Sequence, residues 1–205
     1  SGKSTLLHLL AGIDTPDTGR ILLADPDGIG TTAIGDLSAD ERSALRLRRF
    51  GFVFQQGLLI PELTAAENVA LPLLLIGSSR VEAQQRAEAA LTSLGLAGLG
   101  DRRIGQLSGG QAQRVAIARA LIADPQVIFA DEPTGALDST TAHEVLGQLL
   151  AVCSRTGRAI VIVTHDELVA ARCSGTVRLL DGRLVDDGVH GLDEGAHGLD
   201  DGAHR

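Results

Sequence analysis

A Gly-rich pentapeptide and a pair of adjacent carboxylates constrain this sequence more than any other feature. The pentapeptide, Leu-Ser-Gly-Gly-Gln at Leu107–Gln111, opens a predicted helix. Sixteen residues after Gln111, the apolar strand Val127–Ala130 runs into Asp131 and Glu132. An ordinary hydrophobic core needs neither a Gly-rich helix start nor two carboxylates at a strand end. A bound nucleotide triphosphate would explain both, because its phosphates need close backbone approach and its metal ion needs acidic ligands.

The composition indicates a soluble globular chain with one sizeable core. Of 205 residues, 44% are hydrophobic, and the net charge is -8. This charge argues against a nucleic-acid partner, because such binders neutralise phosphates with clustered Lys and Arg. No apolar run reaches the roughly 18 to 20 residues of a membrane span, so we expect no direct membrane insertion. Cys153 and Cys173 lack metal-ligand spacing and are predicted to be reduced thiols.

The first five residues match part of a phosphate-binding loop. Ser1–Thr5 read Ser-Gly-Lys-Ser-Thr, the end of the pattern G-x-x-x-x-G-K-[ST], while its first four positions are absent. The sequence contains no methionine, so we expect a fragment. Lys3 is the only lysine beside seventeen arginines, and a phosphate loop needs a compact ammonium to reach the β and γ oxygens. The predicted helix Ser4–Ala11 would point unpaired amides at the phosphates.

The second half of the chain alternates helix and strand in the order that a parallel sheet requires. The predicted elements are a helix over Gly110–Ala123, a strand over Gln126–Ala130, a helix over Ser139–Arg155 and an apolar strand over Ala159–Val163. The last strand is expected to be buried on both faces. Two short segments, Val177–Leu180 and Arg183–Val185, predict a hairpin at the edge of the sheet.

The first half contributes two strands, two helical segments and a loop. The predicted elements are a strand over Ile21–Ala24, a loop over Asp25–Gly35, a helix over Ser38–Arg49 with a capping box of Ser38 and Glu41, and a strand over Phe50–Phe54. Helical periodicity over Leu63–Leu99 indicates a separate helical lobe. From Asp187 onward, an imperfect seven-residue repeat rich in Gly, Asp and His predicts a disordered acidic tail over residues 189–205.

These motifs together resemble the nucleotide-binding subunit of ATP-binding-cassette (ABC) transporters. The resemblance covers nearly everything from Ser1 to about Gly188, and six elements occur in the family's order. They are a partial Walker A motif at Gly2–Thr5, the Q-loop at Gln55, the signature at Leu107–Gln111, Walker B at Val127–Glu132, the D-loop at Ala136–Asp138 and the switch histidine His165. The runs Phe50–Gln56 and Asp131–Ser139 look most similar to the branch of lipoprotein-release, macrolide-export and cell-division ATPases.

The resemblance implies an α/β fold of the P-loop NTPase type. Its RecA-like, mostly parallel sheet would be flanked by helices, with an α-helical subdomain inserted at residues 57–118. The cassette would occupy residues 1–188 and lack its N-terminal strands.

The resemblance also implies roles for individual residues. Glu132 would be the general base, His165 would sense the γ-phosphate, and Gln55 would touch the metal ion or the lytic water. Magnesium ligands would be Ser4, Gln55 and Asp131. The nucleotide would be bound by Ser1, Gly2, Lys3, Ser4 and Thr5 of one copy and by Ser108, Gly109, Gly110, Gln111 and Asp138 of the other.

The same resemblance implies partners and a cellular setting. Two copies would form a head-to-tail homodimer around ATP and Mg²⁺, and an integral membrane permease would dock near residues 56–75 at the cytoplasmic face of the membrane. The alternative is a non-transporting ATPase that regulates an extracytoplasmic enzyme through its membrane partner. A DNA-repair ATPase is disfavoured, because only 51 residues separate Gln55 from Leu107, where such proteins carry a long coiled coil.

The missing start of the phosphate loop affects the expected activity of these 205 residues. It removes several backbone donors to phosphate, and neither Tyr nor Trp is present to stack on adenine. We therefore expect ATP hydrolysis by the complete protein and weak or absent nucleotide binding by this sequence alone.

Overall fold

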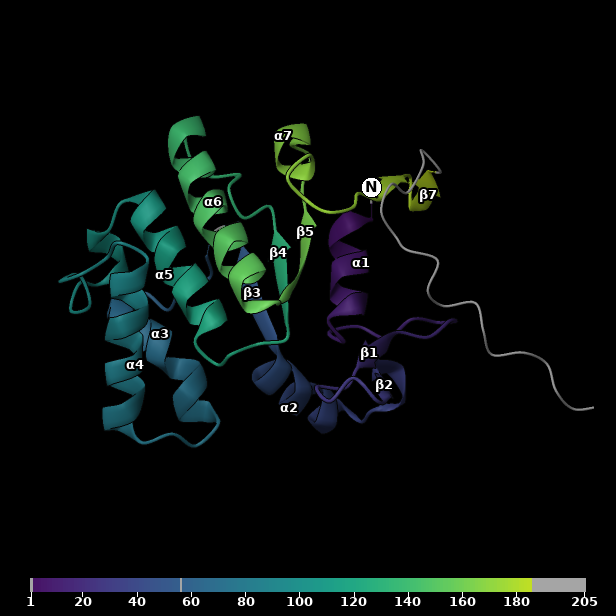
Figure 1. Cartoon of the computed structure of the whole chain (residues 1–205), viewed down its shortest axis with the longest axis horizontal. Coiled ribbons are helices and arrows are strands. Elements are labelled where there is room, and N and C mark those ends of the chain that lie inside the picture. The colour runs from purple at the N-terminus through teal and green to yellow at the C-terminus, as the bar shows by residue number, and fades with distance from the viewer. Residues whose placement is uncertain (1, 56, 186–205) are drawn as a thin grey trace, which may run out of the picture.

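A three-stranded parallel sheet lies at the centre of this computed structural model, which describes residues 2–55 and 57–185 (Figure 1). The strands follow the order β3 (Phe50–Phe54), β4 (Val127–Asp131) and β5 (Ala159–Val163). Phe54 pairs with Asp131, and Asp131 pairs with Val163, so the carboxyl ends of the strands are level. The predicted parallel α/β architecture is therefore confirmed.

Helices and two short hairpins surround this sheet. In chain order these elements are α1 (Lys3–Leu10), β1 (Leu22–Ala24), β2 (Thr31–Ala33), the 3-10 turn η1 (Ile34–Asp36), α2 (Ala39–Arg49), α3 (Ala65–Leu75), α4 (Arg80–Ser93), η2 (Ile104–Gln106), α5 (Gly109–Leu121), α6 (Ser139–Thr156), α7 (Glu167–Ala170), β6 (Arg178–Leu180) and β7 (Arg183–Val185). None of the helices within the described residues is long and apolar enough to cross a membrane.

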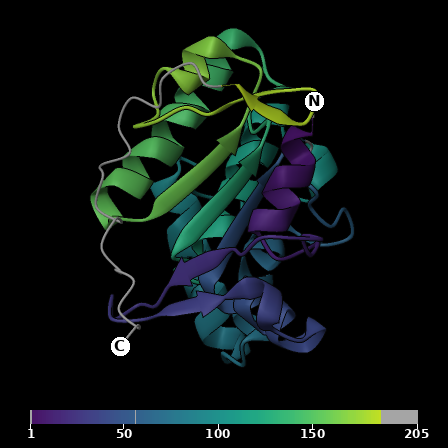
Figure 2. The ribbon, with the colours of Figure 1, turned by 90° about the vertical axis from the view of Figure 1, so that its right-hand side faces the viewer.

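Alternation of side chains along the strands divides the core into two layers. On one face, Phe50 and Phe129 meet edge to face with ring centroids 5.1 Å apart, and both belong to the cluster that contains Leu7 of α1. On the other face, Val53 and Ile128 belong to the cluster formed with α5 and α6. Figure 2 shows the strands between α1 and α6. Side chains alternate between the two faces of a strand, so Asp131 lies on the same face as Phe129, which is the face that α1 covers.

Helices α3, α4 and α5 form the helical part of the molecule beyond β3 (Figure 1). Leu73 of α3, Leu91 of α4 and Val115 of α5 are fully buried in one hydrophobic cluster. That cluster also includes Val53 and Ile128 of the sheet, so α5 joins the helical part to the strands. The boundaries of a helical subdomain at residues 57–118 stay a prediction.

A buried asparagine orders the segment that leads into α3. Asn68 is fully buried, and its Oδ1 accepts a hydrogen bond from the Ile60 amide at 2.8 Å. Its Nδ2 donates to the carbonyls of Ile60 and Thr64, both at 3.0 Å. The side-chain amide thus ties the Ile60 backbone, on both its amide and its carbonyl, to the start of α3.

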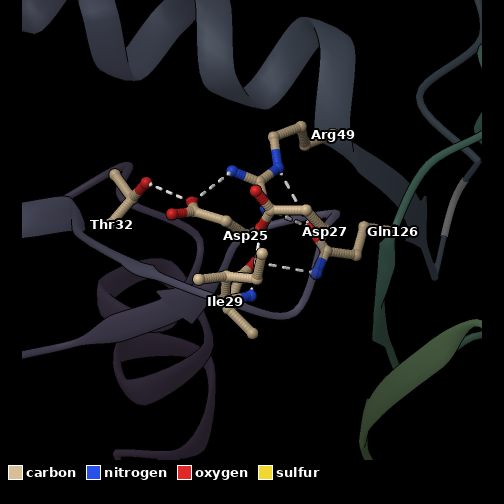
Figure 3. A network of polar contacts seen from close by, with 7 residues as sticks. Asp25, Asp27, Ile29, Thr32, Arg49 and Gln126 are labelled. Carbon is tan, nitrogen blue, oxygen red and sulfur yellow. Dashed lines mark hydrogen bonds and ion pairs between the residues drawn. The ribbon is translucent and has the colours of Figure 1, made fainter.

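A polar network attaches the β1–β2 hairpin to the amino end of the sheet. Figure 3 shows Arg49, at the end of α2, beside Gln126, which precedes β4. Arg49 donates from Nε to Gln126 Oε1 at 3.0 Å, and Gln126 Nε2 donates to the Ala24 carbonyl at 2.9 Å. Arg49 also pairs with Asp25 at 3.5 Å, and Asp25 accepts from the Thr32 hydroxyl at 2.8 Å. The hairpin is thus held at the opposite end of the strands from Asp131.

Most predicted elements agree with the structure to within one or two residues, including the capping box of Ser38 and Glu41. Three expectations are wrong. The predicted loop Asp25–Gly35 contains β2, because Leu23 pairs with Thr32 in an antiparallel hairpin. The hairpin of β6 and β7 forms a separate two-stranded sheet instead of extending the parallel one.

The third correction concerns β5, which was expected to be buried on both faces. Ala159 is exposed and the following four residues are half-buried, because β5 is the edge strand of the sheet within the described residues. The predicted tail at residues 189–205 lies outside the described residues, as do Ser1 and Gln56.

Gly51 provides a test of the packing between β3 and α5. A Cβ added there would lie 2.3 Å from the Ala120 carbonyl oxygen and 3.2 Å from Pro125 Cγ. Because the nearest atom belongs to backbone, we expect Gly51→Ala to lower the free energy of unfolding by about 1–3 kcal/mol, measured by chemical denaturation. Gly35→Ala is the matched control, since a Cβ there meets no atom within 4 Å. Equal stability of the two variants would contradict the packing described.

Candidate functional site

A cavity of about 360 Å³ lies between the start of α1 and the carboxyl ends of β4 and β5. Seven of its lining residues were predicted site residues, and Val163 completes the lining. The seven are Gly2, Lys3, Ser4, Thr5, Asp131, Glu132 and His165. The structure therefore brings together residues that are more than a hundred positions apart in the sequence.

The start of α1 lines this cavity and is suited to bind an anion. Gly2 is the N-cap and has a left-handed backbone with φ of 81°, and no side chain caps the helix. The first amides of an α-helix have no partner within the helix, and the helix dipole places a partial positive charge at this end. Lys3 adds an ammonium to the same wall. This arrangement suits phosphate groups.

Ser4 and Asp131 place two side-chain oxygens side by side, where they could hold a magnesium ion. The Ser4 hydroxyl donates to Asp131 Oδ1 at 3.3 Å, because the alternation along β4 turns Asp131 toward α1. Magnesium is commonly held by one or two protein oxygens together with water and substrate phosphates. The described residues contain no cluster of three or more His, Cys, Asp or Glu side chains that could hold a metal by themselves. The two side chains fit an ion that also binds phosphate oxygens.

Glu132 is not part of the extended strand. On a continuing strand its side chain would diverge from that of Asp131, whereas both residues line the same cavity. Strand β4 ends at Asp131, and Glu132 has a left-handed φ of 46°, which is uncommon for a residue with a Cβ. Its amide still donates to the Val163 carbonyl at 2.9 Å. The left-handed turn explains why adjacent residues share one cavity.

The Glu132 carboxylate is held by two neighbours that follow β5. His165 Nδ1 lies 2.7 Å from Glu132 Oε1, and the Thr164 hydroxyl donates to Oε2 at 3.4 Å. The Glu132 side chain is 20% exposed, whereas that of His165 is 77% exposed. A carboxylate oriented in this way, at the edge of a cavity, can accept a proton from a bound water.

Gln55 lies close to the loop that follows Glu132, but it does not line the cavity. It directly follows β3, and a Cβ added at Gly135 would lie 3.0 Å from Gln55 Nε2. The Gln55 side chain therefore rests against the loop that follows Glu132. Its role as a metal ligand stays a prediction.

The Gly-rich motif forms the start of α5, on the opposite face of the sheet from α1. The Ser108 hydroxyl accepts from the Gln111 amide at 3.3 Å, and Gln111 Oε1 accepts from the Ser108 amide at 2.9 Å. This capping box follows from the Ser-x-x-Gln spacing, a signal that the sequence analysis did not use. Gly109 and Gly110 complete the motif. A Cβ at Gly110 would lie 2.4 Å from Thr141 Cγ2, so glycine allows the close packing of α5 against this side chain of α6.

The signature residues and Asp138 do not line the cavity at Lys3 within one chain. Asp138 caps α6 through the Thr141 amide at 3.0 Å. The predicted nucleotide-binding residues therefore form two groups, one at the start of α1 and one where α5 and α6 begin. Ser1 lies outside the described residues.

Sequence reasoning missed two residues that touch these groups. Thr164 holds Glu132, and its position between a strand and His165 is the signal that could have identified it. Gln113 lies on the buried face of α5 and donates to the Pro133 carbonyl at 2.6 Å. A polar residue within an apolar helix face is the corresponding signal for Gln113.

Comparisons with known proteins agree on one family. The family model described as ABC transporter matches residues 1–135. The macrolide export ATP-binding/permease protein MacB of Burkholderia thailandensis is 44% identical over 187 residues, which is 91% of this chain and 28% of that protein. The lipoprotein-releasing system ATP-binding protein LolD of Chromohalobacter salexigens is 44% identical over 189 residues, or 91% of this chain and 76% of that protein. The chain thus spans about 28% of the length of the macrolide-export relative.

Two solved structures are similar to the chain. One is a dimeric ATP-binding cassette in a post-hydrolysis state bound to ADP and Pi, with a TM-score of 0.78 and 41% identity. The other is a dimeric bacterial ABC transporter cassette, with a TM-score of 0.77 and 42% identity. Each similarity covers 89% of this chain and 78% of the other.

Asp138 provides a test of how the start of α6 is stabilised. The hydrogen bond from the Thr141 amide, joined by one from the Thr141 hydroxyl, lowers the pKa of Asp138 below its ordinary value of 3.8. Because the folded pKa is depressed, the stabilisation that depends on the charge is complete above the unfolded pKa and disappears as the pH falls through the folded pKa. We expect Asp138→Ala to lower the free energy of unfolding at neutral pH and to lower it by less at acid pH, where the protonated carboxyl caps the helix without its charge, as denaturation would measure.

Asp138→Asn is the matched variant for this test. Asn is an equally good N-cap without a titrating carboxylate, so the variant should keep its stability at both pH values. A loss at neutral pH as large as that of Asp138→Ala would show that charge, and not the cap, stabilises α6.

Proposed function

The chain belongs to the ABC transporter family, and from that premise we propose that it binds and hydrolyses ATP to drive a membrane permease. The observation that carries this proposal is the convergence of Lys3, Ser4, Asp131, Glu132 and His165 on one cavity at the start of α1. A phosphate-binding helix terminus, a magnesium ligand pair and an oriented carboxylate are the parts that phosphoryl transfer to water requires.

The amides at the start of α1 and the Lys3 ammonium would bind the triphosphate, and Ser4 and Asp131 would hold the magnesium ion. The bound ion would neutralise charge on the phosphates. Glu132 accepts a proton from the water that attacks the γ-phosphorus, and the bond to the leaving ADP oxygen breaks, which releases inorganic phosphate. His165 orients Glu132 through the contact between His165 Nδ1 and Glu132 Oε1. It also lines the cavity in which the γ-phosphate would lie.

A second copy is proposed to complete the site. Ser108, Gly109 and Gly110 lie away from the Lys3 cavity of their own chain, and Asp138 begins the adjacent α6. In a head-to-tail homodimer these residues would contact the nucleotide bound at the partner's α1. The dimeric cassettes that resemble this chain support such an arrangement.

We propose an integral membrane permease as the other partner. The macrolide-export relative is named as an ATP-binding/permease protein, and the lipoprotein-releasing relative is named as an ATP-binding protein of a releasing system. The cassette would act at the cytoplasmic face of the membrane and contact the permease through residues 56–75. Closure and opening of the dimer would move the helical subdomain at residues 57–118 and, through it, the permease.

Glu132→Gln tests the assignment of the general base. In the full-length protein with saturating ATP and Mg²⁺, we expect kcat to fall by about 10²–10⁴-fold, because the amide cannot take the proton. ATP should still bind, so the variant should accumulate as a dimer in size-exclusion chromatography with light scattering. Glu144→Gln, at an exposed position on α6, is the control and should hydrolyse ATP normally. A Glu132→Gln variant that stays monomeric would refute the ATP-dependent dimer.

The 205 residues by themselves should bind ATP weakly. Charge-assisted hydrogen bonds contribute roughly 1.5–3 kcal/mol each, so two or three missing phosphate-loop donors would cost about 3–9 kcal/mol. That cost moves a micromolar dissociation constant to about millimolar or weaker, as isothermal titration calorimetry would measure. A chain extended upstream to complete the G-x-x-x-x-G-K-[ST] pattern is the control and should recover tight binding. Low-micromolar binding by the 205 residues would contradict this prediction.

A further inference from the structure

One buried side chain of α5 holds the loops that follow β3 and β4. Gln113 is 4% exposed. Its Nε2 donates to the Phe54 carbonyl at 3.2 Å and to the Pro133 carbonyl at 2.6 Å. Phe54 directly precedes Gln55, and Pro133 directly follows Glu132. A single amide nitrogen therefore connects the helix that begins at the Gly-rich motif to the backbone beside two predicted catalytic residues.

The position of these carbonyls explains why the side chain is a glutamine. The Phe54 carbonyl belongs to the last paired residue of β3 and also accepts from the Gly57 amide, whereas the Pro133 carbonyl lies two residues beyond the end of β4. A glutamine amide carries two N–H groups on one nitrogen and can serve two acceptors without adding a charge. An apolar side chain of the same length would fill the space, but it would leave the Pro133 carbonyl without this donor. The requirement at this site is for hydrogen bonding and not only for packing.

A second side chain of α5 holds the far end of the loop after β3. Arg119 donates to the Gly57 carbonyl at 2.7 Å and to the Leu58 carbonyl at 2.8 Å. Gly57 is buried, and a Cβ there would lie 3.4 Å from Ala116 Cβ on the same helix. The segment that carries Gln55 is thus anchored to α5 at both ends. A displacement of α5 would carry this segment with it.

We propose that Gln113 is a positioning residue that transmits movement of the start of α5 to Gln55 and Glu132 of the same chain. The inference rests on the proposed function, in which Ser108 contacts nucleotide bound to the partner, whereas Glu132 acts on nucleotide bound to its own chain. Gln113 lies between the two groups. Occupancy of one site would therefore adjust the catalytic groups of the other and make hydrolysis at the two sites cooperative.

Gln113→Met tests the proposal because methionine has a similar length and lacks the two N–H groups. In the full-length protein we expect kcat to fall about tenfold or more while KM changes by less than about twofold. The Hill coefficient for ATP should fall toward one. ATP affinity, measured in a Glu132→Gln background, should stay the same. Gln85→Met, at an exposed position on α4, is the matched control and should leave all four quantities unchanged.

Two kinetic outcomes would overturn the proposal. One is a Gln113→Met variant with the kcat and the Hill coefficient of the unmodified protein. The other is a parallel loss of kcat, ATP affinity and melting temperature, which would indicate a purely structural role. The separation of kcat from KM and the loss of cooperativity are the readouts that core packing alone would not produce.

Hydrogen exchange separates failure of this inference from failure of the proposed function. The Gly57 amide donates to the Phe54 carbonyl at 2.9 Å, and the Gly135 amide donates to the Glu132 carbonyl at 3.1 Å. Both amides should exchange faster in Gln113→Met and not in Gln85→Met. Unchanged exchange would overturn the inference even if the unmodified protein hydrolyses ATP. Absence of ATP hydrolysis by the unmodified protein would refute the proposed function, and the exchange measurement would still decide whether Gln113 holds the two loops.

Discussion

The level register of three parallel strands is the constraint on which the rest of the structure depends. Because Phe54, Asp131 and Val163 lie side by side, the residues that follow them emerge at one edge of the sheet. Helix α1 packs on one face of the same strands and begins at that edge, so its N-terminal amides meet Asp131 and Glu132 there. Ligands of open α/β sheets bind at this edge for the same geometric reason. The cavity thus follows from register and packing and does not depend on a long loop.

The two faces of the sheet separate the functional residues into two groups. The α1 face carries the helix start that we propose to bind phosphate, the proposed magnesium ligands and Glu132, whereas the α5 face carries Ser108 and Gly110, which packs against Thr141 of α6. Helices α5 and α1 pack in different hydrophobic clusters on opposite faces of the sheet, so their starts lie apart within one chain. The proposed dimer would bring the start of α5 of one copy to the start of α1 of the other. The same separation gives α5 its importance, because it begins at the Gly-rich motif and its Gln113 donates to the loops beside Gln55 and Glu132.

The sequence predicted the strands of the parallel sheet, because strand periodicity is a local pattern, but it missed β2. The grouping of Lys3, Asp131 and His165 was implied by the family resemblance, through the order of the motifs. The left-handed backbone of Glu132 could not be predicted, since it depends on the pairing of its amide with Val163 on a neighbouring strand. The apolar pattern of β5 does not distinguish an edge strand from a central one, because both read as continuous hydrophobic runs. The contact of Gln113 with two carbonyls required the packing of α5 on β3 and β4, which no local pattern specifies.

The hydrogen bonds of Glu132 determine which of its neighbours can move during a reaction cycle. The Glu132 amide is paired with Val163 in the backbone ladder, and Thr164 directly follows that strand, so these two contacts move only with the sheet. His165 is 77% exposed, and water competes for its bond to Glu132. A carboxylate has about four acceptor sites, so Glu132 can bind a water while it keeps these partners. The sheet therefore sets the position of the carboxylate, and His165 is left able to exchange its bond to Glu132 for one to a phosphate oxygen.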